Sequence, residues 1–288
     1  EMCIRDSYQA MAEVIEERFA NWQGQNFDED TLEPSEVAQA IMEYLDCECT
    51  YFPSMADDDP IMSAYSYAQR LGVREGFVPV LIKADDETLL ECLVMNADPK
   101  NDADIYEFDL KTVTEYRKKM LSAPVKDGKA VLEELTGQRK EEAKDDDMDW
   151  DEEVMGEMEG GEPNDRFSSY WDDDTEMTYP LILAKIPVKN PWEIFTYLPF
   201  GNWNDCPDIP ELMAAAKYWF EQYGAVPAAM SHDELEFLLP APVPKEKAMD
   251  AAVELYGFCP DLDQNEDGSI GSLADVLWQS TVWYFWWD

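Results

Sequence analysis

The amino-acid sequence predicts an α+β protein in which a mixed sheet packs against helices. Apolar residues recur at helical spacing in several segments, most clearly in residues 208–223. Two hydrophobic runs of strand length, residues 77–83 and 178–186, are typical of strands that are buried on both faces. Residues 226–230 and 235–239 flank a short polar turn, as the two strands of a β-hairpin do.

The first half of the chain, residues 8–143, is predicted to be mostly helical with at least one strand. Its helices are expected at residues 8–22, 34–45, 61–71, 86–95, 110–121 and 130–144, and its strands at residues 48–53 and 77–83. Asp85 or Asp86 should cap the fourth of these helices. Pro79 has no backbone donor, which favours a bulge or an edge position for its strand. Residues 1–7, EMCIRDS, resemble a translated sequencing adapter, so we expect them to be foreign to the protein.

Between the two halves the composition becomes strongly acidic. Residues 141–176 hold 17 acidic side chains against Lys144 and Arg166, and they lack apolar periodicity. Like charges repel and few groups can be buried, which predicts an acidic disordered linker at residues 144–170 with a separate core on either side. The alternative is an interaction segment for a basic partner, anchored by Trp150 and Met155.

The second half, residues 171–288, is predicted to form a C-terminal domain that contains the mixed sheet with packed helices. Besides the segments named above, helices are expected at residues 245–258 and 273–278, and a short one follows the cap Asn190. The last strand, residues 282–287, is aromatic on both of its alternating faces. We expect it to be an inner strand with both faces covered, because an exposed apolar patch of this size is unusual in a soluble monomer.

The charge of the chain excludes several classes of partner. With 21 Lys and Arg against 64 Asp and Glu, the net charge is −43, which repels nucleic acid and anionic membranes and favours a basic protein. His232 is the single histidine, which excludes sites that need two. Apolar runs of membrane-spanning length are absent, and the scattered cysteines indicate free thiols, so a cytoplasmic location is expected. Cys47 and Cys49 have no further ligands with which to bind a metal.

Residues 263–275 resemble the calcium-binding loop of an EF-hand but lack its closing ligand. Five residues match positions 1, 3, 5, 6 and 8 of such a loop: Asp263, Asn265, Asp267, Gly268 and Ile270. Ala274 then stands where a bidentate glutamate is required. We expect a polar turn here, with Ser269 or Ser272 as the cap of the next helix. The sequence therefore predicts no metal site and no cofactor.

Cys206, His232 and Asp233 are the residues that most resemble a nucleophilic catalytic set. They lie in two loops of the C-terminal half, where a thiol, an imidazole and a carboxylate can meet in space. Packing beside Pro207 and the formation of a hairpin turn explain the same residues without catalysis. We assign no catalytic residue and keep these three as candidates. The residues expected to bind a ligand or partner are Trp203, Asn204, Asp205, Cys206 and His232.

Several strings in the second half are distinctive when they are taken together. They are PWE at 191–193, PFGNWNDCP at 199–207, YW at 218–219, YGA at 223–225, HDELE at 232–236, YGFCPD at 256–261 and WYFWWD at 283–288. With these strings, residues 179–288 resemble the bacterial family catalogued as domain of unknown function 4253. The string EGFVPVLI at 75–82 resembles an upstream portion of longer members. The resemblance implies a bacterial, cytoplasmic α+β protein, and it supplies no activity.

Two functions of different classes follow from these observations. The first is a soluble, non-enzymatic protein of immunity or accessory type that binds a basic partner such as a nuclease toxin. The second is an enzyme with a site around Cys206 and His232. The geometry of these two side chains separates the alternatives, because a nucleophile and its base must lie within hydrogen-bond reach.

Overall fold

A computed structural model describes residues 33–101, 104–172, 174–261 and 269–288. The adapter-like residues 1–7, the expected helix at 8–22 and residues 263–268 of the calcium-like loop lie outside these ranges. In the described part of the chain, no helix combines the length and the apolar character needed to cross a bilayer.

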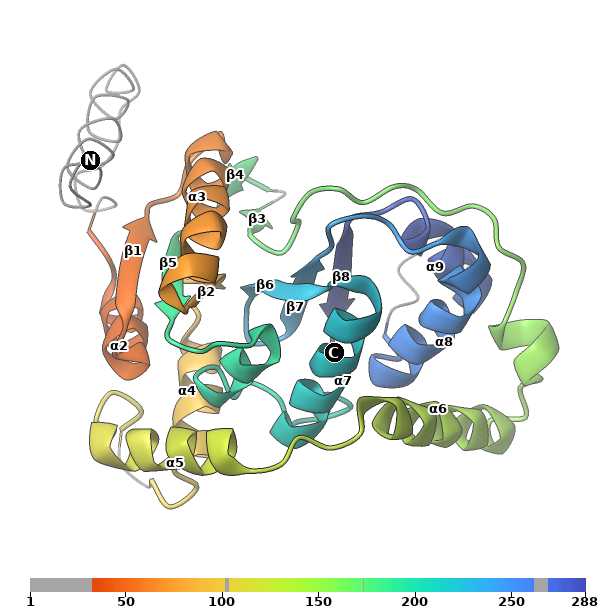
Figure 1. Ribbon diagram of the computed structural model, residues 1–288, viewed down its shortest axis with the longest axis horizontal. Helices are drawn as coiled ribbons and strands as arrows, with labels where there is room; N and C mark the ends of the chain where they lie inside the picture. The colour runs from red at the N-terminus through yellow and green to blue at the C-terminus, as the bar shows by residue number, and fades with distance from the viewer. Residues whose placement is uncertain (1–32, 102–103, 173, 262–268) are drawn as a thin grey trace.

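A mixed six-stranded sheet runs through the molecule in the order β1-β5-β2-β6-β7-β8 (Figure 1). The strands are β1 (Glu48–Phe52), β2 (Val78–Lys83), β5 (Leu181–Ile186), β6 (Val226–Met230), β7 (Glu234–Leu238) and β8 (Val282–Trp286). The strands β2 and β6 are parallel, and the other neighbours are antiparallel. A second, two-stranded sheet pairs β3 (Trp171–Asp172) with β4 (Met177–Thr178). The α+β class predicted from the sequence is confirmed.

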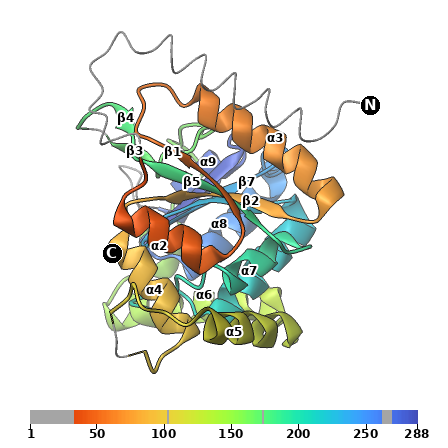
Figure 2. The same ribbon diagram turned by 90° about the vertical axis from the view of Figure 1, so that its left-hand side faces the viewer.

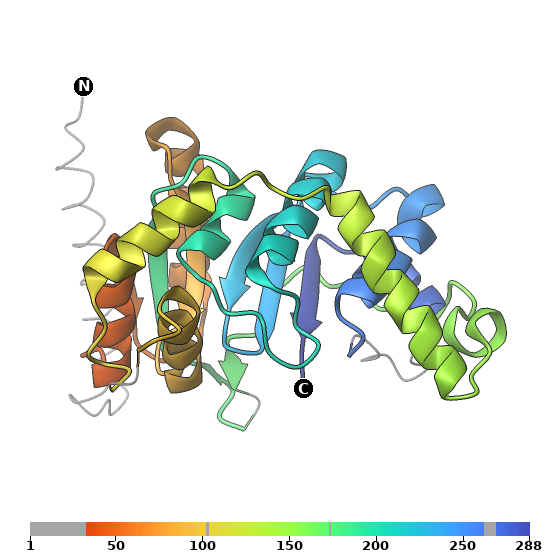
Figure 3. The same cartoon turned by 90° about the horizontal axis from the view of Figure 1, so that it is seen from below.

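Helices cover both faces of the large sheet. They are α2 (Glu36–Leu45), α3 (Asp59–Glu75), α4 (Glu87–Ala97), α5 (Leu110–Ser122), α6 (Gly128–Asp145), α7 (Ile209–Tyr223), α8 (Ala248–Phe258) and α9 (Ile270–Leu277), with the short helices η2 (Trp150–Val154), η3 (Pro191–Thr196) and η4 (Lys245–Lys247). Figure 2 shows α3 on one side of the sheet and α2 and α4 on the other. In Figure 3, α4, α5 and α7 lie in front of the strands, on the face that α2 also covers, and α6 continues beside the sheet next to α8.

Local sequence signals begin several of these helices where they were predicted. The Asp86 side chain accepts a hydrogen bond from the backbone N–H of Leu89 at 2.9 Å, which caps α4. Asp208 and Glu211 form a reciprocal capping box at the start of α7. Ser269 caps α9 and is one of the two alternative caps that the sequence predicted.

Alternate side chains of the inner strands enter two different cores. In β5, Ile182 and Ala184 belong to the larger core with α2, α4, α7 and α8. Leu181 and Leu183 belong to the smaller core, which α3 covers. Because both faces are buried, these strands appear in the sequence as continuous hydrophobic runs.

The two halves of the chain share one sheet, so the expected separate cores are wrong. Strand β5 follows the acidic segment in sequence, yet it pairs with both β1 and β2 of the first half. Strand β5 therefore lies between β1 and β2, which do not pair with each other. The sequence could not reveal this order, because strand pairing over such separations leaves no local signal.

The acidic segment is attached to the body of the molecule and does not form the predicted free linker. Helix α6 extends to residue 145, and η2 follows at Trp150–Val154. The backbone N–H of Gly271 donates to the carbonyl of Met155 at 2.6 Å, and the N–H of Gly161 donates to Asp275 Oδ2 at 2.9 Å. Further along, the buried side chains of Phe167 and Tyr170 join the smaller core. These contacts carry the segment from the α8–α9 end of the molecule back to the smaller core that α3 covers (Figure 1).

Strand β8 lies at the edge of the sheet, which corrects the prediction of an inner strand. It pairs with β7, and the backbone N–H of Val282 donates to the carbonyl of Asn164 in the acidic segment at 3.0 Å. Trp283, Phe285 and Trp287 are buried against α7 and α8, where Trp219 stacks on Phe285 with the ring centroids 5.6 Å apart. The opposite face of β8 is half-buried at Tyr284 and Trp286. Large residues on both faces of a strand therefore indicate that the faces are buried. They do not show whether a second strand pairs with its other edge.

Pro79 belongs to an inner strand, where the sequence favoured an edge or a bulge. It is in register with Lys185 of β5. On the other side, β6 pairs with β2 at Leu81 and Ile82. The missing donor of Pro79 is tolerated because the parallel pairing with β6 starts beyond it.

Glu236 is a buried carboxyl group on the face of β7 opposite the larger core. It is 0% exposed and accepts hydrogen bonds from the backbone N–H of Ser168 at 2.8 Å and from Ser169 Oγ at 2.5 Å. Burial outweighs these hydrogen bonds and raises the pKa of Glu236 to about 7. The acidic segment therefore covers this carboxyl group with its two serines.

We expect the pKa of Glu236 to make the stability of the protein depend on pH. A carboxyl group with a raised pKa stabilises the fold below its ordinary pKa, and this contribution is lost as pH rises through the folded value of about 7. Urea unfolding measures the free energy of unfolding at pH 5.5 and at pH 8.5. The decrease between these two pH values should be smaller in Glu236→Gln than in the wild type by roughly 2–3 kcal/mol. An identical decrease in both proteins would show that ionisation of Glu236 does not destabilise the fold.

Candidate functional site

His232 lies at the sheet edge where the two parallel strands end. The β6–β7 hairpin places His232 just after β6, and Asp86 follows β2 at the start of α4. Because β2 and β6 are parallel neighbours, their carboxyl ends reach the same edge of the sheet. In open sheets, such an edge between parallel strands is where ligands commonly bind.

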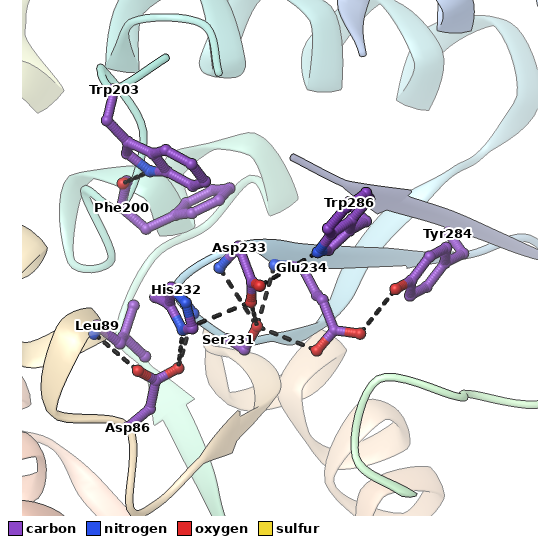
Figure 4. Close-up of polar contacts among 10 residues, drawn as sticks. All are labelled: Asp86, Leu89, Phe200, Trp203, Ser231, His232, Asp233, Glu234, Tyr284 and Trp286. Atoms are coloured by element: carbon purple, nitrogen blue, oxygen red, sulfur yellow. Dashed lines mark hydrogen bonds and ion pairs between the residues drawn. The ribbon is translucent and has the colours of Figure 1, made fainter. Parts of the chain in front are cut away.

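A network of polar side chains surrounds His232 (Figure 4). Asp86 Oδ2 lies 3.0 Å from His232 Nδ1 and accepts the backbone N–H of His232 at 2.8 Å. Asp233 Oδ1 lies 3.4 Å from the same ring nitrogen and accepts from Ser231 Oγ at 2.7 Å. Ser231 Oγ also lies 3.2 Å from a carboxylate oxygen of Glu234. Three carboxylates thus face one imidazole and one hydroxyl group.

Two aromatic side chains of β8 close the outer side of this network. Tyr284 OH donates to Glu234 Oε1 at 2.8 Å, and Trp286 Nε1 donates to Asp233 Oδ2 at 3.2 Å (Figure 4). The backbone N–H of Trp287 donates to the carbonyl of Asp233 at 3.0 Å. The hairpin turn is therefore connected to the last strand of the chain.

The charges of the network shift the pKa values of His232 and Asp86 in opposite directions. The hydrogen bond to Asp86 raises the pKa of His232 above its ordinary value, and partial burial opposes this shift without cancelling it. Burial alone would raise the pKa of Asp86, but the hydrogen bonds from His232 and Leu89 outweigh it, so the pKa is lowered. The pair is therefore ionised most fully at mildly acidic pH.

We expect this pair to stabilise the fold mainly between pH 4 and pH 6.5, about the ordinary pKa values of its two members. The His232 contribution is lost as pH rises through its raised pKa, and the Asp86 contribution is lost as pH falls through its lowered pKa. Asp86→Asn retains the helix cap and removes the charge. In urea unfolding, the variant should lose about 1 kcal/mol at pH 6 and much less at pH 9. Equal losses at both pH values would contradict an ionic contribution.

The loop at residues 199–207 lies beside the other end of α4. Asn96 Nδ2 donates to the carbonyls of Pro199 at 2.7 Å and Gly201 at 2.9 Å. Asn96 and Asp86 are ten residues apart on one helix, which corresponds to about 15 Å along its axis. A Cβ atom at Gly201 would lie 2.4 Å from the carbonyl oxygen of Pro207, so only glycine fits this turn.

The structure does not assemble the candidate nucleophile and base. Cys206 is buried beneath the loop, and burial raises the pKa of its thiol well above its usual range. No hydrogen bond joins Cys206 to His232 among the described residues, and His232 Nδ1 contacts Asp86 and Asp233 instead. Of the three catalytic candidates, the fold brings His232 and Asp233 together and leaves the thiol protonated and apart.

The residues that were predicted to bind a ligand or partner occupy two places. Trp203, Asn204 and Asp205 lie on the loop, where Asp205 pairs with Arg139 at 3.0 Å and Asn204 Nδ2 donates to the carbonyl of Asp288 at 2.6 Å. Cys206 lies below them, and His232 belongs to the hairpin network. The loop residues therefore connect the C-terminus and α6, and their role in binding stays a prediction.

Sequence reasoning missed Asp86 as the partner of His232. It was assigned as a helix cap, which is correct, but its second oxygen contacts a residue 146 positions away. It also missed Glu236, for which a signal existed, because a glutamate between Leu235 and Phe237 is unusual in a buried strand.

Two other places on the surface offer charged groups. Asp57, Asp58 and Asp59 bring three carboxylate oxygens within 4.8 Å of one another, and Asp58 accepts from Tyr170 OH at 2.8 Å. A groove of about 600 Å³ lies between α6, α7 and α8 and suits a small polar ligand by its size. Its charged lining residues are Lys129, Lys140, Lys247, Glu133, Asp250 and Glu254.

The acidic ridge is the most strongly charged part of the described surface; we define it as residues 141–165. Its 13 carboxylates are all exposed, and Lys144 is its single cation. Part of its apolar surface faces inward: Val154 is buried, and Trp150 packs against Tyr256 with the ring centroids 5.9 Å apart, whereas Met148 is exposed. The ridge therefore presents carboxylates on a backbone that is held by the body of the protein.

Comparison with known families supports the resemblance seen in the sequence. Residues 182–288 match the family described as Domain of unknown function (DUF4253), so the C-terminal part of the chain contains this domain. The matched residues include the loop at 199–207, the His232 hairpin and β8. No curated protein and no solved structure matches the chain.

Proposed function

We propose that the protein is a non-enzymatic binding protein of immunity or accessory type that captures a basic protein through its acidic ridge. The observation that carries the proposal is the fixed display of 13 exposed carboxylates along residues 141–165. A free acidic tail would lose conformational entropy on binding, whereas a ridge held by backbone hydrogen bonds loses less.

Electrostatics supports a cationic partner of protein type. The net charge of −43 repels phosphate backbones and attracts basic surfaces at long range. Complementary charge mainly accelerates association and selects the partner. Trp150 and Met155 supply half-buried apolar surface within the ridge, where a partner side chain can pack.

The site around His232 supports binding over catalysis. Its three carboxylates are held by Ser231, Tyr284, Trp286 and backbone groups, which fixes the turn. An activated nucleophile needs a base within reach, and the protonated thiol of Cys206 has no such contact with His232. The enzyme alternative therefore lacks the contact on which it depends.

Two charge-matched variants test the proposal. The ridge variant changes Asp145, Asp147, Glu152, Glu157 and Glu159 to their amides. The control variant changes five exposed glutamates elsewhere to glutamine: Glu43, Glu75, Glu91, Glu107 and Glu134. Both variants carry the same net charge, so they separate a local surface from the charge of the whole molecule.

Binding is measured by biolayer interferometry with two cationic probes, lysozyme and poly-lysine, at low and at physiological salt. We expect the ridge variant to bind about tenfold more weakly than the control variant, since five weak ion pairs add to about 1.4 kcal/mol. The difference should shrink as salt rises. Equal weakening in both variants would show that net charge alone attracts the probes and would remove the ridge as the binding surface.

A further inference from the structure

Two cysteines lie side by side at the β1 edge of the sheet. Cys47 occupies the turn between α2 and β1, directly after Asp46, whose φ of 49° is left-handed. Cys49 follows in β1. The two sulfur atoms are 4.0 Å apart, and both side chains are half-buried, so small molecules can reach them.

A buried guanidinium group interacts electrostatically with Cys47. Arg117 of α5 is 5% exposed and donates to the carbonyls of Tyr44 at 2.6 Å and Leu45 at 3.2 Å. Its guanidinium carbon lies 4.1 Å from the ring centroid of Tyr197, and its Nε has no hydrogen-bond partner. A buried positive charge thus lies near the thiols.

These surroundings distinguish the two thiols. The hydrogen bond between the two sulfurs lowers the pKa of Cys47, and Arg117 adds to this effect, while burial opposes it. The same hydrogen bond raises the pKa of Cys49, and burial adds to it. Cys47 is therefore the thiol that ionises and attacks more readily, and Cys49 is a neighbouring thiol that can resolve a mixed disulfide.

We propose that Cys47 and Cys49 form a reversible redox site that exchanges with small disulfides. The Cys47 thiolate attacks one sulfur of a small disulfide, forms a mixed disulfide and releases the first small thiolate. Cys49 then gives up its proton and attacks the Cys47 sulfur, which releases the second small thiolate. The pair loses two electrons, the small disulfide gains them, and the protons of the two cysteines end on the two small thiols.

The positions of the atoms agree with this step. A disulfide needs its sulfurs at about 2.05 Å, so side-chain rotation must bring these two about 2 Å closer. The turn residue Cys47 lies outside the regular ladder of β1, which begins at Glu48, so no strand pairing fixes its backbone. A metal cation is disfavoured here, because the buried positive charge of Arg117 repels it.

The test uses the full chain, equilibrated with mixtures of reduced and oxidised glutathione, quenched with acid and alkylated. Trypsin releases residues 19–70, in which Cys47 and Cys49 are the only cysteines, so peptide mass reports this pair alone. We expect a reversible loss of two hydrogens from this peptide, at a rate at least about tenfold above glutathionylation of Cys92. Cys49→Ser should stop at a glutathione adduct on Cys47.

Two further variants complete the test. Cys47→Ser should abolish the rapid reaction of this peptide with glutathione disulfide, and Cys92→Ser should leave its rate unchanged. The proposal is overturned if the peptide keeps two free thiols in glutathione disulfide alone, or if Cys47 reacts no faster than Cys92. Micromolar zinc binding that is lost in both Cys47→Ser and Cys49→Ser would instead make the pair a metal site.

Discussion

Removal of residues 282–288 is expected to leave the protein unfolded. Trp283, Phe285 and Trp287 are each at most 1% exposed, and they pack around Trp219 and Phe258. Truncation of one buried aromatic side chain costs about 3–5 kcal/mol. Loss of three at once exceeds the stability of about 5–15 kcal/mol that a typical domain has.

Circular dichroism, melting temperature and solubility measure this effect. The matched control removes Asp288 alone, which lies beyond β8 and should leave a cooperative transition. A truncated protein that melts at the wild-type temperature would show that the aromatic cluster is peripheral to the core.

The fragment of residues 1–143 should also fail to fold alone. In the intact sheet, β1 and β2 each pair with β5, which the fragment lacks. Its remaining strands would expose both hydrophobic faces and unpaired edges. Its helix α6 would also lose its packing against α7 and α8.

Co-expression provides the control for this fragment. Residues 1–143 and 144–288, produced as two chains, should purify together because β5 completes the sheet from the second chain. Near-ultraviolet circular dichroism and urea unfolding report whether each fragment has a fold. A cooperative transition of residues 1–143 alone would restore the interpretation of two separate cores.

Elements with local signals could be predicted from the sequence. The apolar stripe of α7 and the β6–β7 hairpin each depend on residues within a few positions of one another. These features are confirmed with bounds that differ by at most one residue. Local signals of this kind also restricted the cap of α4 to Asp85 or Asp86, and the structure shows Asp86.

The order of the strands could not be predicted, because pairing depends on contacts between distant segments. The hydrophobic run of β5 indicated burial on both faces, but it does not specify β1 and β2 as neighbours. The same limit explains β8, whose aromatic residues indicate covered faces and leave its position at the edge open. The contact between Asp86 and His232 is equally non-local.

The acidic segment was misread because charge dominates its composition. Its anchors are few and irregularly spaced, with Val154, Phe167 and Tyr170 buried among exposed carboxylates. Backbone hydrogen bonds to Asp275, Ser280 and Glu236 complete the attachment, and backbone donors leave no pattern in a sequence. A charge run therefore predicts solvated side chains correctly and says little about the backbone that carries them.

Amide hydrogen exchange across the ridge tests most directly whether it is a fixed surface. The N–H groups of Gly161 and Asn164 donate to Asp275 Oδ2 at 2.9 Å and Ser280 Oγ at 2.8 Å. We expect these amides to exchange at least about 100-fold more slowly than in an unstructured peptide. Asp275→Ala should accelerate exchange at Gly161 more than at Asn164. Exchange of both amides at the unstructured rate in the wild type would contradict the account, because the carboxylates would then belong to a free chain.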